Sequence, residues 1–231
     1  MRKAFSLVEL SIVIVIIALL ISAVMGGGKI LEASKTKKLI TEIKFYKNAI
    51  EVFKTTYGQY PGDISNATSF WGSSGLQDGD GSGIIDWRND NTVFEHANLS
   101  IHLEKAGLIP DHGYTTGNGG GSYPLESYIG YMRVMYSQAT NGFRHVGYNY
   151  LFQNAHMLLL GKDGVTNEAF LKPEGAYRLD TKLDDGKPKS GIMTFRVANN
   201  VTDASCTNSS TSYYIESTSL GCNVVLELDR L

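Results

Sequence analysis

Hydrophobic positions divide the N-terminal part of the chain into two stretches with different patterns. From Leu7 to Met25 the chain is apolar except for Glu9 and two serines, and about 20 such residues in a helix span the hydrocarbon core of a bilayer. Farther along, apolar residues recur every three or four positions, which predicts a helix with one buried stripe. The stripe consists of Leu39, Ile43, Tyr46, Ile50, Phe53 and Tyr57. We therefore predict one helix from about Ser6 to Tyr57, ended by Gly58 and weakened between its halves by the glycines at 26–28.

After Gly58 the apolar residues form short segments separated by turn-forming residues. Helical spacing predicts helices at about 65–72 and 91–109, and Pro173 and Gly186 suit the start and the end of a third. Segments rich in aromatic and branched residues predict strands. These segments are 127–137, 143–152, 155–161, 191–198, 212–217 and 223–229. The expected fold is α+β, with the long N-terminal helix packed on an antiparallel sheet.

Glu9 is the single charged residue in the apolar stretch, and its position needs an explanation. A carboxylate near the middle of a bilayer costs on the order of 3 kcal/mol. Arg2 and Lys3 precede the stretch, so the positive-inside rule predicts a cytoplasmic N-terminus and an exported remainder. A secretory signal peptide and a plain single-span anchor also fit this pattern, although neither gives Glu9 a role.

The segment KAFSLVELSIVIVIIALLI, residues 3–21, resembles the class III signal of type IV pilins and type II secretion pseudopilins. The resemblance implies that prepilin peptidase cleaves between Ala4 and Phe5 and methylates the amino group of Phe5. The family usually has glycine where this chain has Ala4. Glu9 matches the family's glutamate, which implies that it meets the new ammonium group of its own chain or of a neighbour during assembly.

The same resemblance implies a pilin-like architecture and a set of partners. Residues 1–4 would be a leader peptide, 5–28 the transmembrane and filament-core half of the helix, 29–57 its amphipathic half, and 58–231 a globular head. The chain would be a single-pass inner-membrane protein with a periplasmic head, until it joins copies of itself or other pilins in a periplasmic or extracellular filament. Prepilin peptidase and an inner-membrane assembly platform would be its other partners.

The sharpest local motif is DGDGSGIIDWRN, residues 78–89, which we call the Asp/Gly loop. Its spacing follows a twelve-residue calcium loop, with Gly83 at the sixth position, where the chain turns sharply, and with Ile85 as the buried anchor. At the twelfth position Asn89 replaces the usual bidentate glutamate. The predicted Ca²⁺ ligands are Asp78, Asp80, Ser82, the Ile84 carbonyl, Asp86 and Asn89. A solvated turn without a metal is the alternative.

Charge and cysteine content add two constraints. The formal net charge is −2 and no long basic block occurs, so nucleic-acid binding is not indicated. Cys206 and Cys222 are the only cysteines of the chain. In an exported protein we predict that they form a disulfide, with two buried thiols as the alternative.

Enzyme motifs are absent from the sequence. The five histidines have no metal-binding spacing, and neither a GxSxG nucleophile motif nor a phosphate-binding glycine-rich loop occurs. Asp180, Asp184 and Asp185 resemble an acid pair, but we interpret them as a solvated helix end. We predict no catalytic residue, and a structural subunit of a type IV pilus or a type II secretion pseudopilus. The alternative is a membrane-anchored periplasmic binding or hydrolytic domain.

Overall fold

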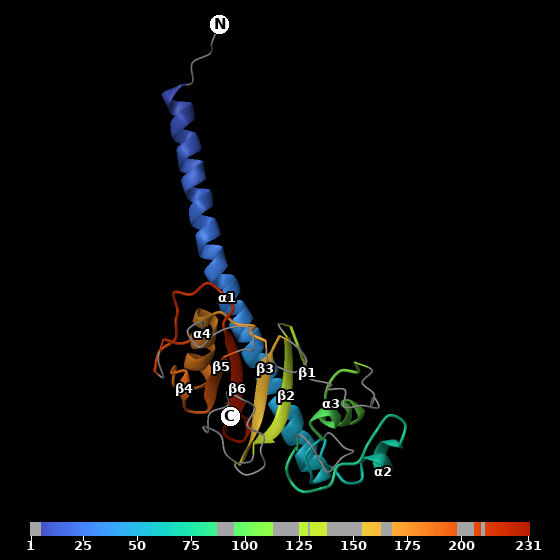
Figure 1. Cartoon of the computed structure of the whole chain (residues 1–231). Helices are drawn as coiled ribbons and strands as arrows, with labels where there is room; N and C mark the ends of the chain where they lie inside the picture. The colour runs from blue at the N-terminus through green and yellow to red at the C-terminus, as the bar shows by residue number, and fades with distance from the viewer. Residues whose placement is uncertain are drawn as a thin grey trace. The chain divides into compact units, whose positions relative to one another are not determined.

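The computed structural model describes residues 6–86, 95–112, 125–128, 130–137, 154–162, 168–197, 206–208 and 211–231, without the side chains of 23–29, 196 and 197. The chain divides into two compact units, Met1–Lys38 and Leu39–Leu231. Helix α1, Leu7–Tyr57, contributes residues to both units (Figure 1).

In the first unit, α1 begins at Leu7 and continues through the glycines at 26–28 without a break in its helical backbone. Between Leu7 and Ile21 its large apolar side chains are all at least 49% exposed. Because they occupy nearly consecutive positions, they cover every face of the helix. In the described ranges, no helix combines the length and the apolar character needed to cross a membrane. The apolar stretch of the sequence runs on to Met25, and the side chains of residues 23–29 are not among those described.

The second unit is built on one antiparallel sheet, whose described strands have the order β1-β2-β3-β6-β5-β4. The strands are β1 Leu125–Ser127, β2 Gly130–Ser137, β3 Ala155–Gly161, β4 Lys189–Ser190, β5 Met193–Val197 and β6 Cys222–Glu227. β3 and β6 lie at the centre, with Leu158 opposite Leu226. The two edge strands, β1 and β4, are the shortest.

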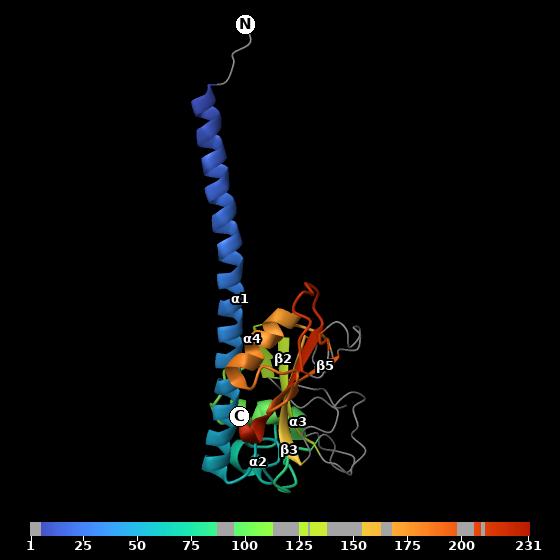
Figure 2. The same ribbon diagram turned by 90° about the vertical axis from the view of Figure 1, so that its left-hand side faces the viewer.

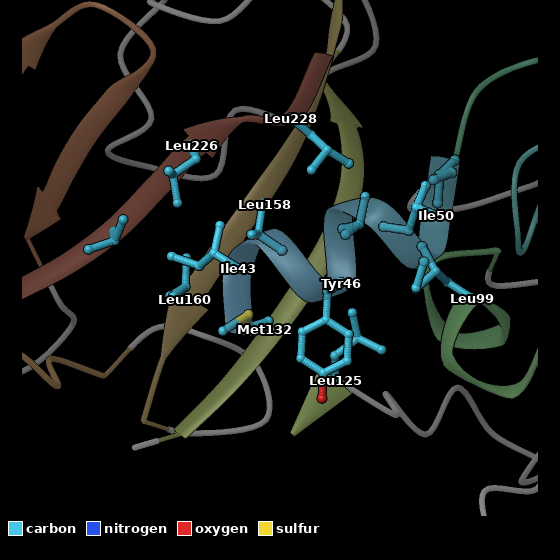
Figure 3. Packing of buried hydrophobic residues seen from close by; sticks show 14 of the residues in the cluster. Ile43, Tyr46, Ile50, Leu99, Leu125, Met132, Leu158, Leu160, Leu226 and Leu228 are labelled. Atoms are coloured by element: carbon cyan, nitrogen blue, oxygen red, sulfur yellow. The ribbon is translucent and has the colours of Figure 1, made fainter. Parts of the chain in front are cut away.

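The helices of the second unit pack around this sheet. Besides the α1 residues from Leu39 onward, they are α2 Ala67–Trp71, α3 Glu95–Lys105, α4 Pro173–Leu183 and the 3-10 helix η2 Leu228–Arg230. Figure 2 shows α1 and α4 beside the same face of the sheet, and their buried residues belong to one core cluster. In Figure 3, Ile43 and Tyr46 of α1 lie over the sheet, and Ile50 lies beside Leu99 of α3. The Tyr46 hydroxyl donates to the carbonyl of Glu126 in β1, which ties the helix to the edge of the sheet.

Most predicted elements are confirmed. The fold is α+β, and α1 ends at Tyr57, where Gly58 takes a φ of 75° that glycine adopts without strain. The predicted strands at 127–137, 155–161 and 191–198 contain β2, β3 and β5, and the strand predicted at 223–229 overlaps β6, which begins one residue earlier. α2 and α3 lie within the ranges predicted for them. The predicted strand at 143–152 lies outside the described residues.

The predicted strand at 212–217 is wrong. Within this segment Tyr213 makes an isolated bridge with Thr207, and no strand is formed. The Tyr213 hydroxyl donates to Asp180, which holds the segment against α4 instead of in the sheet. α4 begins at Pro173 as predicted but ends at Leu183, earlier than the predicted end at Gly186.

Candidate functional site

The start of α1 holds Glu9 in a capping box. Ser6 precedes the helix, and its carbonyl accepts a hydrogen bond from Leu10 N at 3.2 Å. The Ser6 hydroxyl accepts from Val8 N at 3.3 Å, while Glu9 Oε2 accepts from Ser6 N at 2.9 Å. Glu9 therefore has a partner within its own chain, one that the signature Ser-x-x-Glu indicates and that our sequence analysis missed. Ala4 and Phe5, the predicted cleavage site, lie outside the described residues.

The Asp/Gly loop is described from Asp78 to Asp86, and its first residue bonds to α2. Asp78 Oδ1 accepts from Thr68 N at 2.7 Å, and Oδ2 accepts from Thr68 Oγ1 at 2.9 Å. Asp78 thus accepts a hydrogen bond from a backbone N–H in the first turn of a helix, where such N–H groups have no partner within the helix. The predicted twelfth ligand, Asn89, lies outside the described residues.

Two buried carboxylates from outside the loop bind its backbone. Asp63 Oδ2 accepts from Gly83 N at 3.0 Å. Glu95, the first residue of α3, accepts from Asp80 N at 3.0 Å and from Asp86 N at 2.9 Å, one with each carboxylate oxygen. Asp63 and Glu95 were not predicted, because neither belongs to the spacing of the loop itself.

The other predicted ligands lie at different depths in the loop. Ser82 N donates to Asp80 Oδ1 at 2.8 Å, and Ser82 Oγ donates to Asp63 Oδ1 at 3.4 Å. Ile84 is half-buried. Burial, with the charge of Asp80, raises the pKa of Asp86. Ile85 is fully buried, as expected for the anchor of the loop.

Two glycines of the loop are required by its path. A Cβ at Gly79 would lie 2.3 Å from the carbonyl carbon of Asp63, which no real side chain tolerates. Gly83 takes a φ of 88°, in the left-handed region that favours glycine. The glycines of the motif therefore have a structural reason that holds with or without a metal.

A cluster of three carboxylates forms where the loop meets the rest of the unit. Oxygen atoms of Asp63, Asp80 and Glu95 lie within 4.8 Å of one another. Burial raises the pKa of Glu95 to about 7, and the charges of Asp63 and Asp80 add to this effect. Burial also raises the pKa of Asp63. Such oxygens are the ligand type that Ca²⁺ takes, and Asp80 is the predicted ligand that the cluster contains. Calcium binding at this loop stays a prediction.

Two buried histidines hold the chain near the loop. His102 of α3 is fully buried, and its Nδ1 accepts from Gly62 N at 2.8 Å. Its proton therefore lies on Nε2, which donates to Gln77 O at 3.0 Å. Burial lowers the pKa of His102 to about 4. His156 of β3 accepts from Ile85 N through Nε2 at 3.3 Å, and burial lowers its pKa as well.

The acidic group near the end of α4 is less solvated than we predicted. Asp180 is fully buried, where it accepts from the Tyr213 hydroxyl, and burial raises its pKa to about 6. Asp184 Oδ2 accepts from the backbone N–H groups of residues 192 and 193, at 2.6 and 2.8 Å. Asp185 is exposed. The interpretation as a solvated helix end is therefore wrong for Asp180, whose carboxylate fixes the connection from α4 to the sheet.

Cys206 and Cys222 form the predicted disulfide, which rules out the alternative of two thiols. Cys222 is the first residue of β6, so the bond attaches the segment before β6 to the centre of the sheet. Exposed Tyr214, Ile215 and Leu220 lie within the segment that the disulfide closes.

Protein-family models, curated proteins and solved structures give no match to this chain. Its function has to be inferred from the residues and their contacts. Four of the buried side chains described above, in and around the Asp/Gly loop, each accept a hydrogen bond from a backbone N–H. They are Asp63, Glu95, His102 and His156. Contacts of this kind fix the path of a loop, and they favour a structural role for this region.

Proposed function

We propose that this chain is a structural subunit of a type IV pilus or a type II secretion pseudopilus. Prepilin peptidase would cleave it between Ala4 and Phe5 and methylate Phe5, and α1 would then bring copies together in a filament. The observation that carries the proposal is the contrast within α1. Its residues from Leu7 to Ile21 expose apolar side chains on every face, while its residues from Leu39 onward pack on the sheet.

The exposed apolar segment needs an environment other than water. A helix that is apolar all round is stable in lipid or among other apolar helices, because each exposed Å² of apolar surface costs about 25 cal/mol in water. Before assembly, the segment would lie in the inner membrane with the second unit in the periplasm. In the filament, the same segment of neighbouring copies would replace the lipid.

Cleavage would change the surroundings of Glu9. A new ammonium group at Phe5 would lie next to Ser6. The backbone N–H of Ser6 already donates a hydrogen bond to Glu9. Opposite charges attract strongly away from water, whereas either charge alone is costly there. Glu9 would therefore bind the ammonium group of its own chain, or that of the neighbouring copy once the filament has assembled.

Replacement of Glu9 by glutamine separates the charge from the helix cap. Glutamine also serves at this position of a capping box, so Glu9→Gln should keep the cap and lose the charge. We expect Glu9→Gln and Glu9→Leu to insert and to be processed, but to be missing from filaments isolated from cells. Ser11→Ala is a matched control in the same stretch and should assemble normally. Filaments that contain Glu9→Gln at the wild-type level would refute the assembly role of the charge.

The mass of the mature N-terminus tests processing directly. The proposal expects a chain that begins with methylated Phe5. An intact Met1 or a cut after Ala23 would instead support a membrane-anchored periplasmic binding or hydrolytic domain.

A further inference from the structure

The outer edge of β2 is covered by two different partners. β1 pairs with β2 from Gly130 to Met132, and farther along β2 the Asp/Gly loop takes the place of a strand. There Tyr136 N donates to the carbonyl of Ile85 at 2.8 Å. The Ile85 side chain is fully buried, so the loop is held by packing in addition to this hydrogen bond. An uncovered strand edge presents backbone groups that other chains can pair with.

His156 holds the other side of Ile85. Because its Nε2 accepts from Ile85 N at 3.3 Å, the imidazole is neutral and carries its proton on Nδ1. Nδ1 lies 3.2 Å from the Asp229 carboxylate of η2, and Asp229 also accepts from His156 N at 2.9 Å. The His156 residue is 3% exposed and packs against the rings of Tyr60 and Tyr136. Each nitrogen of the ring thus has a defined partner.

We propose that His156 is a pH-sensitive latch, whose protonation at Nε2 releases Ile85, and with it residues 78–86 of the Asp/Gly loop, from the edge of β2. The added proton turns the acceptor of the Ile85 N–H into a donor, so two N–H groups face each other inside the protein. The loop moves away, and the Tyr136 N–H at the strand edge becomes open to solvent or to another chain. The reaction is the uptake of one proton from water.

The groups around His156 set the direction of the response. Burial is the largest influence and lowers the pKa of His156 from its ordinary value of 6.5. Asp229 and Glu51 act against this shift, whereas Lys54 adds to it. The segment between α1 and α2 contributes the neutral side chain of Tyr60, and β2 contributes that of Tyr136. Because the pKa in the folded protein is depressed, the contact is complete above pH 6.5 and is lost as the pH falls toward that lower pKa.

Glu95 responds to acid in the opposite direction. Its raised pKa means that the folded protein binds its proton more readily, so acid stabilises the Glu95 region. Glu95 accepts a hydrogen bond from Asp86 N, next to Ile85. Protonation of Glu95 therefore also changes the stability of the loop. A comparison of variants at His156 removes this contribution, because Glu95 is the same in each of them.

Amide hydrogen exchange of Ile85 and Tyr136 tests the latch in the full-length chain. We expect the ratio of the protection factor in the wild type to that in His156→Gln, at both amides, to fall about tenfold for each pH unit below 6.5, until the pKa of His156 in the folded protein is reached. His156→Gln has no titrating ring at this position, and the contribution of Glu95 cancels in the ratio because it is the same in both proteins. His112→Gln is the matched control, because His112 is exposed and 3.6 Å from Glu126, and it should follow the wild type. Equal pH profiles for His156→Gln and the wild type would overturn the latch.

Asp229→Asn provides a second variant that keeps the imidazole. Asparagine still accepts from His156 N but lacks the charge that favours the protonated ring, so the pKa of His156 should fall further. The total loss of protection on acidification should then be larger than in the wild type, with protection at neutral pH retained. If Asp229→Asn lowers protection equally at every pH, the histidine contact is only structural and the latch is refuted.

Discussion

Replacement of His102 by glutamine should remove a pH-dependent part of the stability of the second unit. The ring is fully buried, with Nδ1 accepting from Gly62 N and Nε2 donating to Gln77 O. Burial lowers its pKa from 6.5 to about 4. A proton on Nδ1 would face the Gly62 N–H donor, and the hydrogen bond between them would be lost. Protonation of His102 therefore destabilises the folded state.

The size of the effect follows from the difference between the two pKa values. A shift of one pKa unit corresponds to about 1.4 kcal/mol, so His102 contributes about 3 kcal/mol that depends on pH. The depressed pKa fixes the sign. The contribution is fully present above pH 6.5 and is lost as the pH falls from 6.5 to 4.

Urea unfolding of the full-length chain in detergent, between about pH 4 and pH 7, measures this contribution. The free energy of unfolding of the wild type minus that of His102→Gln should rise by about 3 kcal/mol over this range. His112→Gln, which removes an exposed ring, is the matched control. The reasoning is refuted if the difference for His102→Gln is independent of pH, because the buried ring would then titrate like an exposed one.

Three further predictions concern other parts of the chain. Removal of the disulfide in a Cys206→Ala and Cys222→Ala double variant should lower the free energy of unfolding by about 3 kcal/mol, as measured by urea unfolding, because the bond links residues 16 apart in sequence. If the Asp/Gly loop binds Ca²⁺, the melting temperature in millimolar Ca²⁺ should be a few degrees higher than in EDTA, and Asp80→Asn should abolish this difference. Equal melting temperatures in Ca²⁺ and in EDTA would mean that the loop is an acidic turn without a metal. Ala4→Leu should block prepilin peptidase, so that the uncleaved precursor accumulates on gels; normal processing would exclude this cleavage site.

Elements that depend on local spacing were predictable from the sequence. The stripe from Leu39 to Phe53 alternates in steps that only a helix brings to one face, and each of its members is buried. Gly58 marks the end of α1, because its φ of 75° is one that other residues avoid. The central strands were recognised from runs of branched and aromatic residues.

The contacts around the Asp/Gly loop were not predictable in the same way. The calcium-loop spacing assumes that the carboxylates of the loop turn toward a common centre, but Asp78 bonds to Thr68 in α2. Asp63 and Glu95, which bind the loop backbone, come from segments before and after it, and only the tertiary fold brings them together. Tyr213 misled the strand prediction for a similar reason, because its pairing with buried Asp180 depends on α4.

The place of β6 in the sheet constrains when the second unit can fold during synthesis. β6 follows all the other described strands in the sequence, yet it lies between β3 and β5. Until β6 has been synthesised, β3 lacks one of its two neighbours and the pair β4 and β5 has no strand to join. Pairings so distant in sequence also form slowly. The chain therefore completes its sheet only after synthesis of its last described strand, and a chaperone that binds exposed strand edges would have its substrate in the interval before that.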